Sequence, residues 1–385
     1  MSTTSTSLIS FRRRELAEQF CNALTGDGLL DARSGLFLAA QRRVGKSTFL
    51  REDLIPLALE RGWVCVYVDL WADRSRDPAL LIGEAVRDVI AGHAGLVSKL
   101  AKAIGLSKVT VAGALTMDVG SNGLPAGLTL TQALTELARL AEKPVLLVID
   151  EAQHALTTPA GSEAMFALKA ARDALNSSNQ APSLMLVFTG SNRDKLAHLV
   201  RTSKMPFYGC NVTPFPLLGR DFSDIFCATV NQRLSPTNQF QPDAVWAAFD
   251  LLGRRPELLR SVIADVAMAG EATDLSTLLK SNASVIQARI WHDIQSEYQS
   301  LTPIQQAVVR VMASASEGFS PFGDASMKRY AELCHEAVSP PSVQNALENL
   351  RSREIIWRES RGSYELEDQS WKMWLLSQNL LLAPA

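Results

Sequence analysis

Four short apolar runs, separated by longer amphipathic stretches, constrain the fold of this 385-residue sequence more than any other feature. The runs cover residues 36–39, 64–70, 145–149 and 184–188, and each is bounded by polar or chain-breaking residues. Strands that are apolar along their whole length are buried on both faces, and the stretches between them are long enough for crossover helices. The pattern therefore predicts an α/β fold with a doubly wound parallel sheet.

Composition excludes several classes of protein. Hydrophobic residues make up 47% and charged residues 20%, which rules out a disordered chain, and the net charge of −2 gives no overall attraction to nucleic acid or to an anionic membrane. The five cysteines form no CxxC pair, the Ser/Thr-rich start does not read as a secretory signal, and no apolar run is long enough to span a bilayer. We expect a reduced, cytoplasmic protein without a membrane segment.

The sequence pattern changes along the chain and predicts three domains. Residues 1–216 form the α/β core, and alternating apolar residues with nearby glycines over 106–128 predict a β-hairpin inserted in it. Residues 217–300 read as a helical lid, because short helical patterns replace the strands. Residues 301–385 show three helical patterns followed by two short strands around Arg361-Gly362, an order that is typical of a winged-helix domain.

The segment after the first apolar run carries the clearest chemical signal. Gly45-Lys46-Ser47 precedes a helical pattern, and a phosphate cradle needs inward-facing backbone N–H groups, a lysine and a hydroxyl at such a point. In the GxxxxGK[ST] pattern the first glycine would fall at position 40, where this chain has Ala40. The residues expected to bind nucleotide phosphates are Gln41, Arg42, Arg43, Val44, Gly45, Lys46, Ser47 and Thr48.

The third apolar run ends in two acids, Asp150 and Glu151. A site for a nucleoside triphosphate and Mg²⁺ needs a carboxylate for the metal and a second group that orients the attacking water, both at the end of a neighbouring strand. We assign Asp150, together with Ser47, to Mg²⁺ and Glu151 to the water. Taken alone, two acids after a strand also fit a helix N-cap.

The fourth run ends in polar residues that belong at the same edge of the sheet. Asn192, or alternatively Ser191, is a candidate sensor of the γ-phosphate, and either residue also fits a cap for the helix that starts near Arg193. Asp69, at the end of the second run, either supports the site or caps a turn.

Several segments, in this order along the chain, resemble the archaeal-type AAA ATPases, which lie near the STAND signalling ATPases and the origin-recognition ATPases. The resemblance spans roughly residues 8–375 and implies a P-loop NTPase fold of AAA type. It implies that Phe11 and Arg14 lie near adenine, that Arg255 (or Arg254) of the lid approaches the γ-phosphate, and that a neighbouring subunit supplies an arginine finger. The matching segments are Phe11 to Leu16, Arg42 to Ser47, Leu147 to Gln153, Phe188 to Ser191 and Gly253 to Pro256.

Together these features predict an ATP hydrolase that depends on Mg²⁺ and acts as a nucleotide-controlled switch, forming a homo-oligomer when it holds ATP. The expected partner is DNA or a protein, in particular one bound to DNA. Residues 301–385 contain eight Lys/Arg and ten Asp/Glu, so the winged helix has no net positive charge for DNA phosphates and a protein partner stays open. A nucleotide-dependent scaffold that does not hydrolyse ATP and a small-molecule phosphotransferase are the alternatives.

Overall fold

The computed structural model describes residues 11–92, 123–124, 128–177, 182–268, 274–315, 319–360 and 362–382, and it divides into two compact units. The core unit consists of residues 12–40 and 46–215. The C-terminal unit contains the chain from residue 216 onward, together with Phe11 and the short segment 41–45, which groups with this unit by its contacts. Each unit is described separately.

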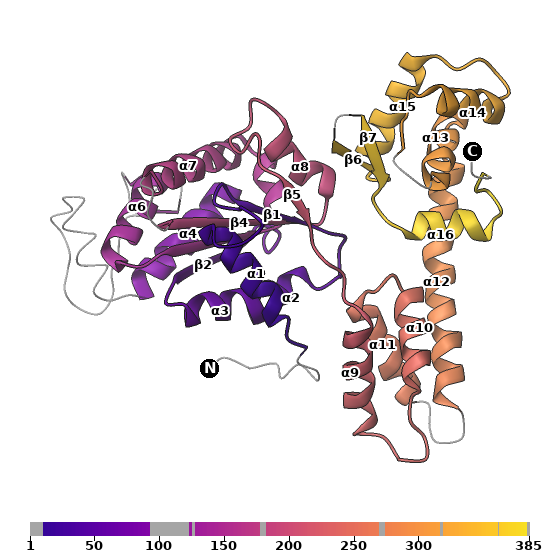
Figure 1. Cartoon of the computed structure of the whole chain (residues 1–385), viewed down its shortest axis with the longest axis horizontal. Helices are drawn as coiled ribbons and strands as arrows, with labels where there is room; N and C mark the ends of the chain where they lie inside the picture. The colour runs from indigo at the N-terminus through magenta and orange to yellow at the C-terminus, as the bar shows by residue number, and fades with distance from the viewer. Residues whose placement is uncertain are drawn as a thin grey trace. The chain divides into compact units, whose positions relative to one another are not determined.

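The core unit is built on a parallel sheet of five strands in the order β2-β3-β4-β1-β5 (Figure 1). Four of the strands coincide with the four apolar runs, so the predicted α/β class with a parallel sheet is confirmed. The strands are β1 (Leu36–Ala39), β2 (Val64–Asp69), β3 (Val145–Asp150), β4 (Leu184–Gly190) and β5 (Val212–Pro214).

Helices cover both faces of the sheet because strand side chains alternate between the faces. Val145, Leu147 and Ile149 of β3 belong to a hydrophobic core with one set of helices, and the intervening residues of the strand are also fully buried. That set consists of α4 (Pro78–Gly92), α6 (Leu130–Ala141), α7 (Pro159–Leu175) and α8 (Arg193–Arg201), whereas α1 (Arg14–Thr25) and α3 (Ile55–Glu60) lie on the other face (Figure 1).

The helix that follows β1 is interrupted by a π turn. It begins as α2 (Lys46–Phe49), continues through the π segment η1 (Leu50–Leu54) and ends as α3. Pro56 has no backbone N–H to donate within the helix, and the N–H of Ile55 donates to the carbonyl of Leu50, five residues back. A proline within the helix therefore accounts for the irregular turn that precedes it.

Two parts of the core unit differ from, or lie beyond, the sequence prediction. The sequence predicted one strand too few. Strand β5 follows the last predicted run in the sequence and pairs with β1. This strand has only three residues and contains Pro214, which suits an edge position. The β-hairpin predicted over 106–128 lies outside the described residues, apart from residues 123, 124 and 128.

The C-terminal unit begins with a helical part whose core is formed by α9, α10, α11 and the first half of α12. A second core follows, made by three helices and a two-stranded antiparallel hairpin in the predicted order, and by a final helix that the sequence analysis did not predict. The elements are α9 (Arg220–Asn231), α10 (Pro242–Leu251), α11 (Pro256–Ala267), α12 (Leu275–Gln299), α13 (Pro303–Ser314), α14 (Asp324–Cys334), α15 (Pro340–Ser352), β6 (Ile356–Ser360), β7 (Ser363–Leu366) and α16 (Ser370–Ser377).

Helix α12 joins the two cores of the C-terminal unit. It is a single helix of 25 residues. Asp274 caps it by accepting the backbone N–H groups of Ser276 and Thr277. Leu279 near its start packs in the first core and Tyr298 near its end packs in the second. In the described part of the chain, no helix combines the length and apolar character needed to cross a membrane.

Candidate functional site

The carboxyl ends of three neighbouring strands bring the predicted chemical groups to one edge of the sheet. Strand β4 lies between β3 and β1, with Ala39 opposite Gly190 and Ile149 opposite Phe188. Because neighbouring strands are about 4.8 Å apart, the end of β3 lies roughly 10 Å across the sheet from the end of β1. The start of the phosphate-loop segment and the acidic pair therefore share one edge.

The loop after β1 has the backbone conformation that a phosphate cradle needs. Arg43 (φ 66°) and Gly45 (φ 93°) both adopt left-handed conformations, and a Cβ added to Gly45 would meet no atom within 4 Å. The space beside Gly45 is therefore open. Ala40 does not adopt a positive φ, so the alanine at this position causes no backbone strain. The departure from the GxxxxGK[ST] pattern is tolerated because the left-handed residues lie later in the loop.

Lys46 opens helix α2 and is largely buried, with 5% of its surface exposed. Its Nζ atom donates a hydrogen bond of 2.8 Å to the carbonyl of Ala40, which closes the loop at its base. A buried ammonium group requires such a partner, and a phosphate oxygen is an equivalent acceptor. Ser47 is half-buried beside it and Thr48 is exposed.

The remaining loop residues have partners within the C-terminal unit. Gln41 donates from Nε2 to the carbonyl of Glu367 (2.9 Å). Arg43 lies 3.6 Å from a carboxylate oxygen of Glu257, and both side chains are exposed, so this pair contributes little stability. Arg42 is exposed, whereas Val44 is buried.

Asp150 is completely buried, and both of its carboxylate oxygens are held by hydroxyl groups. The Thr189 hydroxyl donates to Oδ1, and the Tyr67 hydroxyl donates to Oδ2 over 3.0 Å. The Tyr67 oxygen in turn accepts from Arg51 Nη2 at 3.0 Å. Burial and the nearby Asp150 charge raise the pKa of Tyr67, so the phenol stays protonated and acts as a donor.

Glu151 adopts a left-handed backbone conformation (φ 55°), which costs about 1 kcal/mol for a residue other than glycine. Its Oε2 atom accepts three hydrogen bonds: from the Ser191 hydroxyl (2.6 Å), from the Ser191 backbone N–H (3.1 Å) and from Gln153 Nε2 (2.6 Å). A Cβ on Gly190 would lie 2.7 Å from Gln153 Oε1, so glycine is required for this close approach. The carboxylate is therefore oriented by preformed donors.

The polar residues after β4 and β2 serve several purposes. Asn192 caps α8, because its side chain accepts the backbone N–H of Lys195 (2.8 Å). Ser191 holds Glu151 instead of capping the helix. Asp69 accepts the N–H of Trp71 (2.9 Å) and therefore stabilises the turn after β2. The assignment of Asn192 as γ-phosphate sensor stays a prediction.

The residues expected near adenine and the γ-phosphate have partners within their own units. Phe11 packs edge-on against Phe222 of α9, with ring centroids 5.4 Å apart. Arg14 is exposed on α1 and forms ion pairs with Glu18 (3.1 Å) and Glu60 (2.8 Å).

The two lid arginines that follow Gly253 are both ion-paired within the C-terminal unit. Arg255 is mostly buried and pairs with Asp368, which directly precedes α16. Arg254 pairs with Asp250 (2.9 Å) and stacks on the Trp246 ring.

Sequence reasoning missed two groups that complete the site. Tyr67 lies in an apolar run, and its only signal is the alternation of Cys65, Tyr67 and Asp69 along the less buried face of β2. Gln153 was noted only as part of the acidic motif. No pattern indicated that it would return to hold Glu151.

The structure fits a bound nucleotide and Mg²⁺ through the chemistry of its donors and acceptors. The Ser47 hydroxyl and the Asp150 carboxylate are hard oxygen ligands of the kind that Mg²⁺ prefers, alongside phosphate oxygens and water. In the described ranges no three His, Cys, Asp or Glu side chains gather into a metal cluster.

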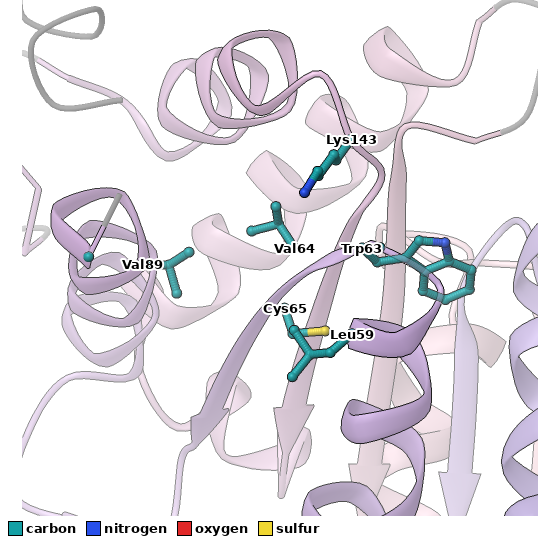
Figure 2. Close-up of a pocket in the computed structure, with 8 residues that line it drawn as sticks. Leu59, Trp63, Val64, Cys65, Val89 and Lys143 are labelled. Carbon is teal, nitrogen blue, oxygen red and sulfur yellow. The ribbon is translucent and has the colours of Figure 1, made fainter. Parts of the chain in front are cut away.

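A separate pocket lies at the opposite edge of the same sheet. Figure 2 shows Trp63, Cys65, Val89 and Lys143 around a cavity of about 350 Å³ near the amino ends of β2 and β3. Burial raises the pKa of the Cys65 thiol to about 12, so the thiol is not a nucleophile near neutral pH. This pocket lacks the acids and hydroxyls of the carboxyl edge.

Comparison with solved structures identifies the fold. A Walker-type ATPase of Pyrococcus abyssi is 19% identical, with a TM-score of 0.54 over 95% of this chain and 96% of that chain. The ORC2 protein of Aeropyrum pernix in its ADP form is 14% identical, with a TM-score of 0.53 over 95% and 92%. The same protein in ADPNP and ADP complexes is 15% identical, with a TM-score of 0.50 over 95% and 92%.

At these identities the likeness shows the fold alone, which is similar to that of the Walker-type ATPase and of the ORC2 protein. No family model matches the sequence, and no curated protein matches it.

Proposed function

We propose that this protein is an ATP hydrolase that requires Mg²⁺ and acts as a nucleotide-controlled switch on DNA or on a protein bound to DNA. The observation that carries the proposal is the shared carboxyl edge, where buried Lys46 follows β1 and the held pair Asp150 and Glu151 ends β3. The solved neighbours support it, since one is described as a Walker-type ATPase and another was solved with ADP and ADPNP.

Each residue has a distinct task in the proposed reaction. The loop N–H groups and Lys46 neutralise the phosphates, and Ser47 with Asp150 would hold Mg²⁺. The ion, when bound, offsets the charge on the phosphate oxygens. Glu151 accepts a hydrogen bond from the attacking water and orients it, while Ser191 and Gln153 keep its carboxylate in place. Asn192 of the core and Arg255 of the lid are proposed to contact the γ-phosphate, and Phe11 and Arg14 to lie near adenine.

The partner proposal rests on the three-helix and hairpin part of the C-terminal unit, which we assign as a winged helix. The exposed face of α15 presents Gln344, Asn345 and Asn349, amide side chains that suit the edges of adenine bases. Arg353, which directly follows the end of α15, is paired with Glu297 at 2.7 Å. Because residues 301–385 contain eight Lys/Arg and ten Asp/Glu, the segment has no net positive charge, and DNA affinity should depend weakly on salt. Fluorescence anisotropy with duplex DNA at two salt concentrations tests this, and a protein partner is the alternative if no duplex binds.

The proposed enzyme is separated from a non-hydrolysing scaffold by one substitution and its matched control. Glu151→Gln should keep ATP affinity within about threefold and lower phosphate release at least a hundredfold, because water loses its orienting acceptor. Glu163→Gln, at an exposed position of α7, should leave both unchanged. Calorimetry measures binding and a phosphate assay measures turnover. A protein that binds ATP but releases no phosphate without any substitution is a scaffold.

Assembly and location complete the proposal. We propose a cytoplasmic protein that forms a homo-oligomer when it holds ATP, with an arginine finger from the neighbouring copy. Size-exclusion chromatography with and without a slowly hydrolysed ATP analogue tests assembly directly. Elution at the same volume in both conditions would count against oligomerisation and leave the ATPase proposal to the test on Glu151.

A further inference from the structure

A chain of three side chains reaches the buried carboxylate of Asp150 from outside the phosphate loop. Arg51 Nη2 donates to the Tyr67 oxygen at 3.0 Å, and the Tyr67 hydroxyl donates to Asp150 Oδ2 at 3.0 Å. The three residues come from the π turn after α2, from β2 and from β3. The chain therefore connects the helix that carries Lys46 with the acid that ends the neighbouring strand.

The carboxylate needs this chain because it is fully buried. In the described part of the protein, no lysine or arginine pairs directly with Asp150, and a buried anion without compensation is costly. The guanidinium of Arg51 polarises the Tyr67 phenol, and donors linked in this way strengthen one another in a low-dielectric interior. The positive charge of Arg51 thus acts on Asp150 through one intermediate hydroxyl.

Geometry also fixes the rotation of the carboxylate. Thr189 holds Oδ1 from the β4 side and Tyr67 holds Oδ2 from the β2 side, so both oxygens are fixed at once. Arg51 lies over the Tyr67 ring, with 4.9 Å between the guanidinium carbon and the ring centroid, and this packing limits movement of the phenol. Oδ1 also accepts the backbone N–H of Glu151 at 3.2 Å, so the second lone pair of Oδ2 is the one available to another ligand.

We propose that Tyr67, supported by Arg51, is a positioning residue that holds Asp150 in the orientation that receives Mg²⁺. The inference rests on the proposed nucleotide site. It assigns a role to a tyrosine and an arginine outside the phosphate loop and the acidic motif. Partners that orient a metal ligand commonly change metal affinity by ten- to a hundredfold when they are removed.

The test compares Tyr67→Phe and Arg51→Met with Tyr208→Phe, which alters an exposed tyrosine of the core unit. Electron paramagnetic resonance measures Mn²⁺ affinity in the presence of ADP, and calorimetry measures ADP affinity in EDTA. We expect roughly tenfold weaker Mn²⁺ binding for Tyr67→Phe and about threefold for Arg51→Met, with ADP affinity in EDTA within twofold. The double variant should match Tyr67→Phe, because both changes break one chain.

Each outcome decides between the two proposals. Mn²⁺ affinity within twofold of the unmutated protein in both Tyr67→Phe and Arg51→Met would overturn the positioning role and leave the nucleotide site intact. Failure of the unmutated protein to bind ADP in either condition would remove the nucleotide site and this inference with it. If circular dichroism shows that Tyr67→Phe does not fold, Arg51→Met decides alone, since the Arg51 side chain is 53% exposed and its replacement is tolerated more easily.

Discussion

The two edges of the same parallel sheet differ in what they bury. At the carboxyl edge, Asp150 and Glu151 are held by hydroxyl, amide and backbone donors of the protein itself. At the amino edge, Cys65 and Trp63 line a hollow of about 350 Å³ whose cation, Lys143, is exposed. The difference teaches that preformed partners around buried polar groups mark the reactive edge, whereas open volume alone does not.

The largest expected effect on ATP affinity comes from replacing Lys46 at the carboxyl edge. Lys46→Met should weaken ATP binding by at least about a hundredfold, because it removes the buried cation that we propose binds the phosphates. Lys143→Met makes the same change at the amino edge and should leave ATP affinity within twofold. Calorimetry of both variants gives the answer, and equal losses would show that the two edges do not differ in function.

The donors around Glu151 are expected to produce the next largest effect. Ser191→Ala and Gln153→Ala should each lower turnover roughly tenfold while ATP binding is retained, because each removes a hydrogen bond to a charged group. Ser183→Ala, at the amino end of β4, is the matched control and should not change turnover. A phosphate release assay distinguishes these outcomes. Unchanged turnover in both site variants would contradict the orienting role of these donors.

Asp368, in the C-terminal unit, provides a third test of the proposed nucleotide site. If Arg255 contacts the γ-phosphate, Asp368 competes for the same guanidinium, so Asp368→Asn should raise ATP affinity about threefold. Asparagine still accepts the N–H of Ser370, so the start of α16 is preserved. Asp250→Asn, which frees Arg254 instead, should have no effect on calorimetric ATP affinity. A similar gain in both variants would argue against a specific role of Arg255.

The smallest effect on ATP binding is expected from alkylation of Cys65. Its pKa of about 12 lies above the ordinary value, so at pH 8 only about one thiol in ten thousand is a thiolate and labelling is slow. The rate should rise about tenfold for each pH unit up to the pKa, and unfolding in urea should remove the delay. Peptide mapping by mass spectrometry follows the labelling. Loss of ATP affinity in labelled, folded protein would show that the pocket at the amino edge influences nucleotide binding at the carboxyl edge.

The sequence predicted the frame of the site because its signals are local. Apolar runs locate four strands, and Gly45-Lys46-Ser47 and Asp150-Glu151 follow two of them directly. Parallel pairing then places these groups at one edge without further information. Local patterns also located the helices of the C-terminal unit up to α15, whereas α16 had no such signal.

The remaining features depend on contacts between distant residues. Strand β5 has three residues and is defined only by its pairing with β1. The partners of Asp150 come from residues 67 and 189, and no periodicity in a single segment reveals such a meeting. The sequence raised Ala40 as a concern, yet the backbone turns left-handed at Arg43 and Gly45 instead. Which residue of a loop takes the unusual conformation depends on the folded loop as a whole.

Helix α12 has a mechanical consequence for the C-terminal unit. Its 25 residues form a rod about 37 Å long, and Leu279 and Tyr298 anchor its two ends in separate hydrophobic cores. If the helix stays straight, a tilt of about 10° at one anchor displaces the other, about 28 Å away, by roughly 5 Å. A small rearrangement among α9, α10 and α11 would therefore be amplified along α12 into a displacement of several ångströms in the core that contains the β6–β7 hairpin.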